Sequence, residues 1–202
     1  MDLTWEQADK VSSGGGAFFK IQDGETVNVR FLYNTMEDIK IKAVHSVNGS
    51  NGGFATIECS REPGEPMESC KWCAQGNRMQ AKVIIPIFNE DAGEVQYWTR
   101  SSTFVKDNLL PVFSEIPQGQ PISGQPFKIK RTGTKMQDTN YNIMASIGTT
   151  NDGKTKDQFG EVKDPKELNI IRPNDYEFPA ASANNNQQGN GFTSTRRTTD
   201  VF

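Results

Sequence analysis

The only histidine of this sequence and all three of its cysteines lie in one window, at His45, Cys59, Cys70 and Cys73. Their spacing is H-x13-C-x10-C-x2-C. One imidazole and three thiolates are a typical donor set for a structural zinc ion, which takes four protein ligands in a tetrahedron. The alternative, three buried thiols and an unrelated histidine, does not explain why all four residues crowd together. The sequence therefore predicts one zinc ion with a structural role.

Other cysteine and histidine chemistries fit this window less well. A zinc deaminase carries H-x-E and P-C-x-x-C motifs, but His45 lacks the following glutamate and Ser69 precedes Cys70. A thioredoxin-type C-x-x-C pair would leave Cys59 unexplained, and a disulfide framework would have an even number of cysteines. The sequence also contains no P-loop and no G-x-S-x-G motif, so we expect a protein that is not an enzyme.

Length and composition favour one domain with polar ends. The chain has 202 residues, a net charge of −3 and 34% hydrophobic residues, which is low for a chain folded throughout. Because the overall charge is negative, an anionic ligand would need a local basic surface. No secretion signal and no run of about 18 apolar residues is present, so we expect no membrane contact. Thiols committed to a metal suit a reducing cytoplasm, that of the host cell if the protein is viral.

Alternating, β-branched segments dominate the middle of the chain and predict five to seven strands. The strand-like segments are 18–21, 26–33, 39–47, 54–57, 80–88, 94–101, 127–130 and 140–145. One short helix is expected from Asp107 to Ile116, before the last hairpin. Many short strands with a helix between two late strands are typical of an OB fold. The predicted fold class is all-β, with an OB-fold barrel at 14–178 and an inserted zinc-binding loop at about 45–80.

Basic and aromatic side chains are interleaved along these strands. Cations neutralise phosphates and aromatic faces stack on unpaired bases, so the combination favours binding of single-stranded DNA. About half of the aromatic residues are expected in the core. Tyr97 and Trp98 are adjacent in a strand and cannot both face the core, so at least one of them is expected to point outward or into the binding groove. The candidate DNA-binding residues are Lys40, Lys42, Lys71, Trp72, Arg78, Lys82, Tyr97, Trp98, Arg100, Phe104, Lys128, Lys130, Arg131, Lys135 and Tyr141.

The cysteine–histidine spacing resembles the zinc subdomain of the replication single-stranded DNA-binding proteins of large tailed bacteriophages. The stretch from Phe127 to Gly133, followed by Thr139-Asn140-Tyr141, resembles the late hairpin common in those proteins. The resemblance covers roughly residues 17–178. It implies an OB barrel with a zinc loop, ligands at the four positions named above, and coating of single strands without sequence preference during replication, recombination and repair.

The two ends of the chain differ from the middle. Residues 1–13 are predicted to form an amino-terminal arm that either packs on the core or contacts a neighbouring copy, which would give self-association on DNA. Residues 179–202 are polar and expected to be a flexible tail. Its tip resembles the acidic-aromatic tips by which single-strand binders recruit replication or recombination proteins, and an unselected polar end is the alternative. The candidate partner-binding residues are Asp200, Val201 and Phe202.

Three other functions stay open on the sequence. An RNA-binding module of the same fold would recognise the 2′-hydroxyl group. A zinc-stabilised adaptor protein would dock a partner through its metal loop and bind no nucleic acid. A zinc-dependent nuclease would cleave the strand that it binds.

Overall fold

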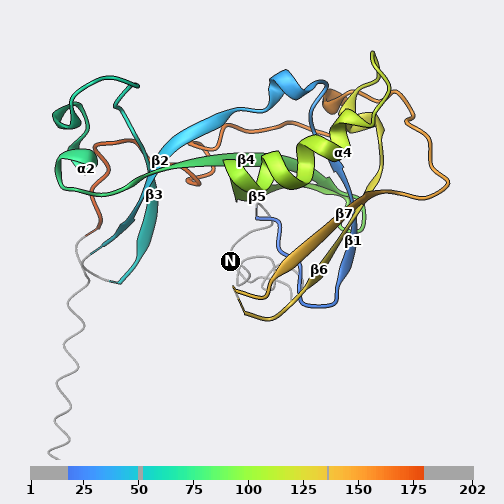
Figure 1. Ribbon diagram of the computed structural model, residues 1–202, viewed down its shortest axis with the longest axis horizontal. Coiled ribbons are helices and arrows are strands. Elements are labelled where there is room, and N and C mark those ends of the chain that lie inside the picture. Colours follow the sequence, from blue (N-terminus) through green and yellow to red (C-terminus); the bar gives the residue numbers. More distant parts are fainter. Residues whose placement is uncertain (1–17, 50–51, 136, 180–202) are drawn as a thin grey trace, which may run out of the picture.

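The computed structural model of the chain describes residues 18–49, 52–135 and 137–179. This part is mostly β-structure, which confirms the all-β prediction (Figure 1). The predicted arm at 1–13 and the tip formed by Asp200, Val201 and Phe202 lie outside the described residues. Among the helices of the described ranges, none has the length and apolar character needed to cross a membrane.

Seven strands form one antiparallel sheet in the order β3-β2-β4-β1-β6-β7, with β5 on the other edge of β4. Hydrophobic alternation predicts their ends to within about two residues. The segment at 18–21 is not a strand and contributes a single parallel bridge from Phe18 to Tyr97. The strands are β1 Thr26–Phe31, β2 Ile41–Asn48, β3 Phe54–Glu58, β4 Met79–Asn89, β5 Glu94–Ser101, β6 Phe127–Thr132 and β7 Asn140–Ala145.

The longest strand, β4, joins the two lobes of the molecule. Its second half pairs with β1 and its first half pairs with β2, so β1 and β2 lie end to end along one edge of β4. Beyond β1 lie β6 and β7, and beyond β2 lie β3 and the short helix α2 (Lys71–Ala74), as Figure 1 shows. Val83, Ile85 and Ile87 alternate along β4 and are fully buried in the core of the larger lobe.

A continuous helical stretch covers the core of the larger lobe. It consists of α3 (Ser102–Phe104), the π-helical η3 (Val105–Leu109) and α4 (Leu110–Ser114). The predicted start at Asp107 is therefore wrong, because the helical stretch begins at Ser102, whereas its end at Ser114 lies within two residues of the predicted Ile116. Ser101 caps the stretch, because its Oγ accepts a hydrogen bond from the backbone N–H of Phe104 at 3.1 Å. Single 3-10 turns lie at η1 Met36–Asp38, η2 Met67–Ser69, η4 Ile122–Gly124 and η5 Lys156–Gln158.

The sheet is not closed into a barrel. No hydrogen-bonded ladder joins β5 to β7 within the described ranges. Aromatic rings bridge the two strands instead: the Trp98 and Tyr141 ring centroids are 5.2 Å apart, and Phe104 lies against both. The two strands therefore approach each other through side chains at this place.

The last described segment ties the two lobes together. We call residues 163–178 the strap. Ile170 and Ile171 are buried against Val44 of β2 and Tyr97 of β5. The backbone of Arg172 then bonds to β3 on both sides, accepting from Glu58 N–H and donating to the Thr56 carbonyl, each at 2.8 Å. In Figure 1 the strap is the orange-red segment that ends beside α2.

Candidate metal centre and candidate nucleic-acid interface

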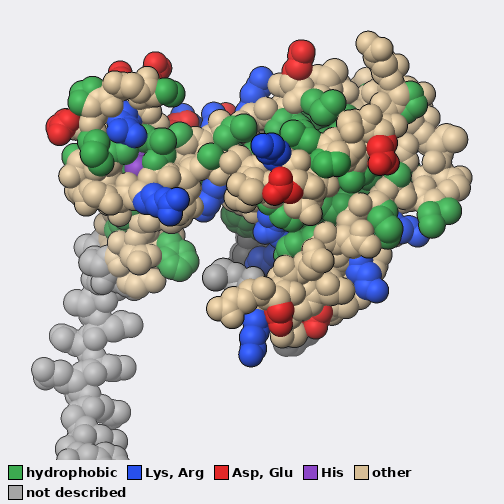
Figure 2. Space-filling model, in the orientation of Figure 1, with side chains coloured by type: hydrophobic (Ala, Val, Ile, Leu, Met, Phe, Trp, Pro, Cys, Tyr) green, Lys and Arg blue, Asp and Glu red, His purple; other side chains and the backbone are tan. Residues whose placement is uncertain are grey.

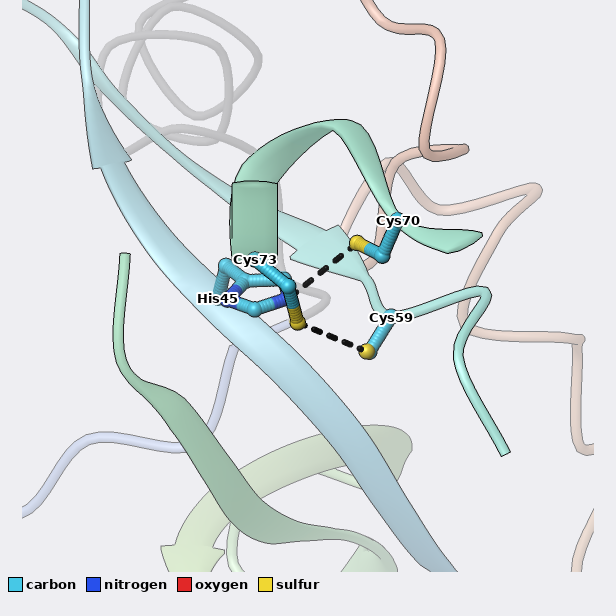
Figure 3. A group of neighbouring side chains, drawn as sticks. All are labelled: His45, Cys59, Cys70 and Cys73. Atoms are coloured by element: carbon cyan, nitrogen blue, oxygen red, sulfur yellow. Dashed lines mark hydrogen bonds between the residues drawn. The ribbon is translucent and has the colours of Figure 1, made fainter. Parts of the chain in front are cut away.

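Three structural elements bring the four predicted metal ligands together. His45 lies on β2, Cys59 follows the last residue of β3, and Cys70 and Cys73 lie at the start of α2. The β2–β3 hairpin pairs His45 with Ile57, so Cys59 leaves the hairpin close to the imidazole. Figure 3 shows the four side chains converging on one point. The four donor atoms lie within 4.8 Å of one another, which makes this group a candidate metal centre.

The donor separations match a four-coordinate ion. Nε2 of His45 is 3.4 Å from Sγ of Cys70 and 3.5 Å from Sγ of Cys73, and Sγ of Cys59 is 3.8 Å from Sγ of Cys73. A tetrahedron with metal–sulfur bonds of about 2.3 Å and metal–nitrogen bonds of about 2.0–2.1 Å has edges of about 3.8 Å and about 3.6 Å. The side chains are thus already spaced as ligands.

Packing holds this arrangement in a small core of its own. His45, Cys70 and Cys73 are buried, and Trp72 packs with them while its Nε1 donates to the Asn174 carbonyl at 2.8 Å. Figure 2 shows the resulting lobe set apart from the main body, with the purple imidazole largely covered. We call the module formed by β2, β3, α2 and the end of the strap the metal module. Nδ1 of His45 is buried and has no hydrogen-bond partner among the described residues.

The protonation of the thiols also favours a bound cation. Burial alone would raise the pKa of Cys70, but hydrogen bonds from the backbone of Cys73, Ser60 and Trp72 outweigh burial and lower it to about 6. Burial and, after it, the neighbouring thiols of Cys59 and Cys70 together raise the pKa of Cys73 to about 11. Three thiolates therefore repel one another unless a cation lies among them.

Two neighbouring hollows lie at the place where β5 approaches β7. The Phe104 hollow, of about 610 Å³, has Lys82, Arg100, Phe104, Asn108, Arg131 and Tyr141 in its lining. The Phe18 hollow, of about 520 Å³, adds Phe18, Lys20, Tyr97 and Trp98 and shares Thr99, Arg100, Arg131 and Tyr141 with the first. Neither lining contains an aspartate or a glutamate. Among the described residues, the two hollows thus form a cationic, partly aromatic surface, which is a candidate nucleic-acid interface.

Arg100 lies at the centre of this surface. Its guanidinium carbon is 4.3 Å from the Trp98 ring centroid and 4.4 Å from that of Tyr141. Burial lowers the pKa of Arg100 most strongly, Tyr141 acts in the opposite direction, and the charge of Arg131 lowers it further. The structure therefore brings seven of the predicted DNA-binding residues to these hollows directly: Lys82, Tyr97, Trp98, Arg100, Phe104, Arg131 and Tyr141.

Two adjacent aromatic candidates on β5 are both almost fully buried. Tyr97 and Trp98 do point to opposite faces of β5, yet only 4% and 3% of their surfaces are exposed. Neither side chain points into solvent, because the strap covers the second face of the sheet and buries Tyr97, but both residues line the Phe18 hollow. Trp72 is likewise buried, in the metal module.

The remaining basic candidates lie away from the two hollows. Lys128 and Lys130 are exposed on the face of β6 opposite to Arg131, and Lys135 is exposed in the turn after β6. Lys40 and Lys42 line a separate hollow together with Asp38 and Asp164. On the metal module, Lys71 and Arg78 are exposed, and Lys71 lies over the Trp72 ring.

Sequence reasoning missed residues that have no motif around them. Lys20 and Asn108 line the hollows, and neither position carries a spacing or composition signal. Asn174 bonds to Trp72 and lies 3.2 Å from the Cys70 sulfur, although it follows that cysteine by more than one hundred residues. The chain matches no protein-family profile, no curated protein and no solved structure.

Proposed function

We propose that this chain is a non-catalytic, zinc-stabilised protein of the OB type that coats single-stranded DNA without sequence preference. Its setting would be the cytoplasm, during DNA replication, recombination and repair. The observation that carries the proposal is the pair of acid-free hollows, in which Lys82, Arg100 and Arg131 lie beside aromatic rings. Cations beside exposed ring faces are what an unpaired, flexible strand requires.

Zinc is the metal that the donor set favours. Three sulfurs and one imidazole nitrogen suit zinc, whereas calcium and magnesium prefer oxygen ligands. All four positions of the tetrahedron belong to protein side chains, so no position is open for a reacting water. The metal would therefore hold the module together rather than act on a substrate.

The element order supports an OB-type arrangement although the sheet is open. β1 pairs with both β4 and β6, and the helical stretch from Ser102 to Ser114 connects β5 to β6 (Figure 1). An OB fold places its helix between two of its late strands in the same way.

A titration with oligonucleotides tests the proposal. We expect oligo(dT) to bind and blunt duplex of the same length to bind at least tenfold more weakly. The logarithm of the binding constant should fall with the logarithm of the salt concentration, with a slope of about −0.7 per phosphate contacted. Equal binding of duplex, or an affinity for single strands that does not change with salt, would contradict it. If an RNA oligonucleotide of the same length binds more tightly than the DNA and displaces it, the RNA-binding alternative is favoured.

One observation favours an adaptor function, with the partner docked on the larger lobe and not on the metal loop. A hollow of about 510 Å³ lies between β2 and the helical stretch, and its lining includes Met36, Ile39, Ile41 and Leu110. Met36 and Ile41 are 47% and 63% exposed and belong to the lining of the same hollow, and apolar side chains grouped in this way are typical of a docking surface. A protein that bound no oligonucleotide at low salt would leave this docking function as the better candidate.

A further inference from the structure

The two hollows share one wall, and this wall contains two arginine side chains. Arg100 and Arg131 line both hollows, together with Thr99 and Tyr141. Arg100 is held between the rings of Trp98 and Tyr141, and Nη1 of Arg131 donates to the Ile21 carbonyl at 2.7 Å. Both guanidinium groups are therefore fixed in place before any ligand arrives.

The two guanidinium groups are not neutralised within the described part of the chain. No carboxylate there forms an ion pair with Arg100 or Arg131. Nε of each arginine is buried and has no hydrogen-bond partner. Burying a charged donor without an acceptor costs free energy, and two like charges beside each other add to that cost. An anion at the shared wall would offset the two unneutralised positive charges.

We infer that the shared wall is a seat for one phosphodiester group, and that each hollow takes one of the two nucleosides joined by it. This inference rests on the proposed function and specifies its smallest ligand, an unpaired dinucleotide step. Arginine binds phosphate through two parallel N–H···O hydrogen bonds. A single phosphate group between two arginines can accept hydrogen bonds from both of them. The neighbouring hollows then lie on the two sides of that phosphate.

The size and lining of the hollows agree with this assignment. Their volumes of about 610 and 520 Å³ lie within the range of about 300–1,000 Å³ that small-molecule sites occupy. Phe104 offers an aromatic surface in one hollow and Phe18 offers one in the other, and Phe18 is 43% exposed. Ring faces accept any base, so the seat would select for an unpaired phosphodiester rather than for a sequence.

The test compares two dinucleotides on the unaltered protein. Thymidylyl-thymidine carries one negative charge, and its methylphosphonate analogue has the same bases and no charge. We expect the charged dinucleotide to bind about tenfold more tightly or better, because hydrogen bonds to a charged group are worth more than those to a neutral one. In NMR spectra of the 15N-labelled protein, the Nε–H signals of Arg100 and Arg131 should shift with the charged ligand only.

Variants locate the seat. Arg100→Gln should bind the two dinucleotides equally, and Arg131→Lys should keep the charge and lose part of the preference. Lys106→Gln is the matched control, because Lys106 is exposed on η3 and outside both hollows. A preference that persists in Arg100→Gln, or equal binding by the unaltered protein, would overturn the seat while long oligo(dT) still bound. Failure of oligo(dT) itself would overturn the proposed function.

Discussion

Cys70 connects the metal centre to the strap, since its sulfur lies near both His45 and Asn174. We expect Cys70→Ala to reduce the bound metal from about one ion per chain to a small fraction, because three ligands hold zinc more weakly than four. Far-ultraviolet circular dichroism should stay close to that of the unaltered protein, because the larger lobe has its own core. Elemental analysis provides the metal content. Ser69→Ala leaves all four donors in place and serves as the control, and full metal content in Cys70→Ala would contradict the assignment.

Trp98 is a core residue that also borders the candidate interface. Its ring lies within 5.6 Å of the Phe19 ring and 5.2 Å of the rings of Phe104 and Tyr141, measured between centroids. Trp98→Ala should therefore lower the free energy of unfolding by about 3–5 kcal/mol. Urea denaturation measures the change, and Met144→Ala, at a residue 44% exposed, should cost less than about 0.5 kcal/mol. A loss below about 1 kcal/mol for Trp98→Ala would show that the ring is not part of the core.

The convergence of the four candidate metal ligands could be predicted from sequence because a C-x2-C pair, a third cysteine and a histidine in one window admit few other structures. The roles of single aromatic residues could not. Alternation assigns Tyr97 and Trp98 to opposite faces of β5, but it does not show that the strap covers one face and the helical stretch the other. Burial on both faces depends on segments distant in sequence.

At the scale of elements, the strap should control how firmly the metal module holds its ion. Removing every residue after 162 takes away Ile170, Ile171 and Asn174 together. We expect that truncation to speed metal transfer to a coloured chelator at least tenfold. A truncation after 179 keeps the whole strap and should leave the rate unchanged. Equal rates for both truncations would mean that the ligands alone determine retention.

The strands were predictable since apolar alternation at 26–31, 79–89 and 94–101 needs no partner to be recognised. The start of the helix was not. Asp107 is a good capping residue by type, but Ser101 caps the stretch, since β5 ends there and its last side chain already faces the first helical turn. The strap could not be predicted, because its sequence has no periodic pattern. Backbone hydrogen bonds to β3 hold it in place instead.

At the scale of the whole molecule, two aspartates fasten the segment at 152–156 to the larger lobe. Burial by itself would raise the pKa of Asp152, but the backbone of Lys154 and the charges of Arg30 and Lys154 outweigh it and lower the pKa. Burial would also raise the pKa of Asp38. Backbone hydrogen bonds from Asn34 and Thr35 and the positive charge of Lys156 outweigh burial, so the pKa of Asp38 is lowered as well.

A lowered pKa in the folded state has a definite consequence for stability. As the pH falls, these aspartates take up protons in the unfolded chain before they do so in the folded protein. Both aspartates therefore stabilise the fold fully above their unfolded pKa of about 3.9. This contribution is lost as the pH falls through their pKa in the folded protein. We expect the melting temperature to drop steeply below about pH 4. Asp152→Asn should start lower at pH 7 and show a shallower drop. Parallel curves for the two proteins would contradict a role for Asp152. Comparing them removes the contribution of the metal centre, which both proteins retain.

The return of the strap to β3 also sets an order of events during synthesis of the chain. The four ligands leave the ribosome early, but Arg172 and Asn174, which complete the metal module, follow Cys73 by roughly a hundred residues, or about 5–20 s of translation. During that interval the nascent chain contains the four candidate ligands, but the strap does not yet cover them. Metal captured then would exchange freely, and it would become trapped only when the end of the strap has emerged and closed over β3.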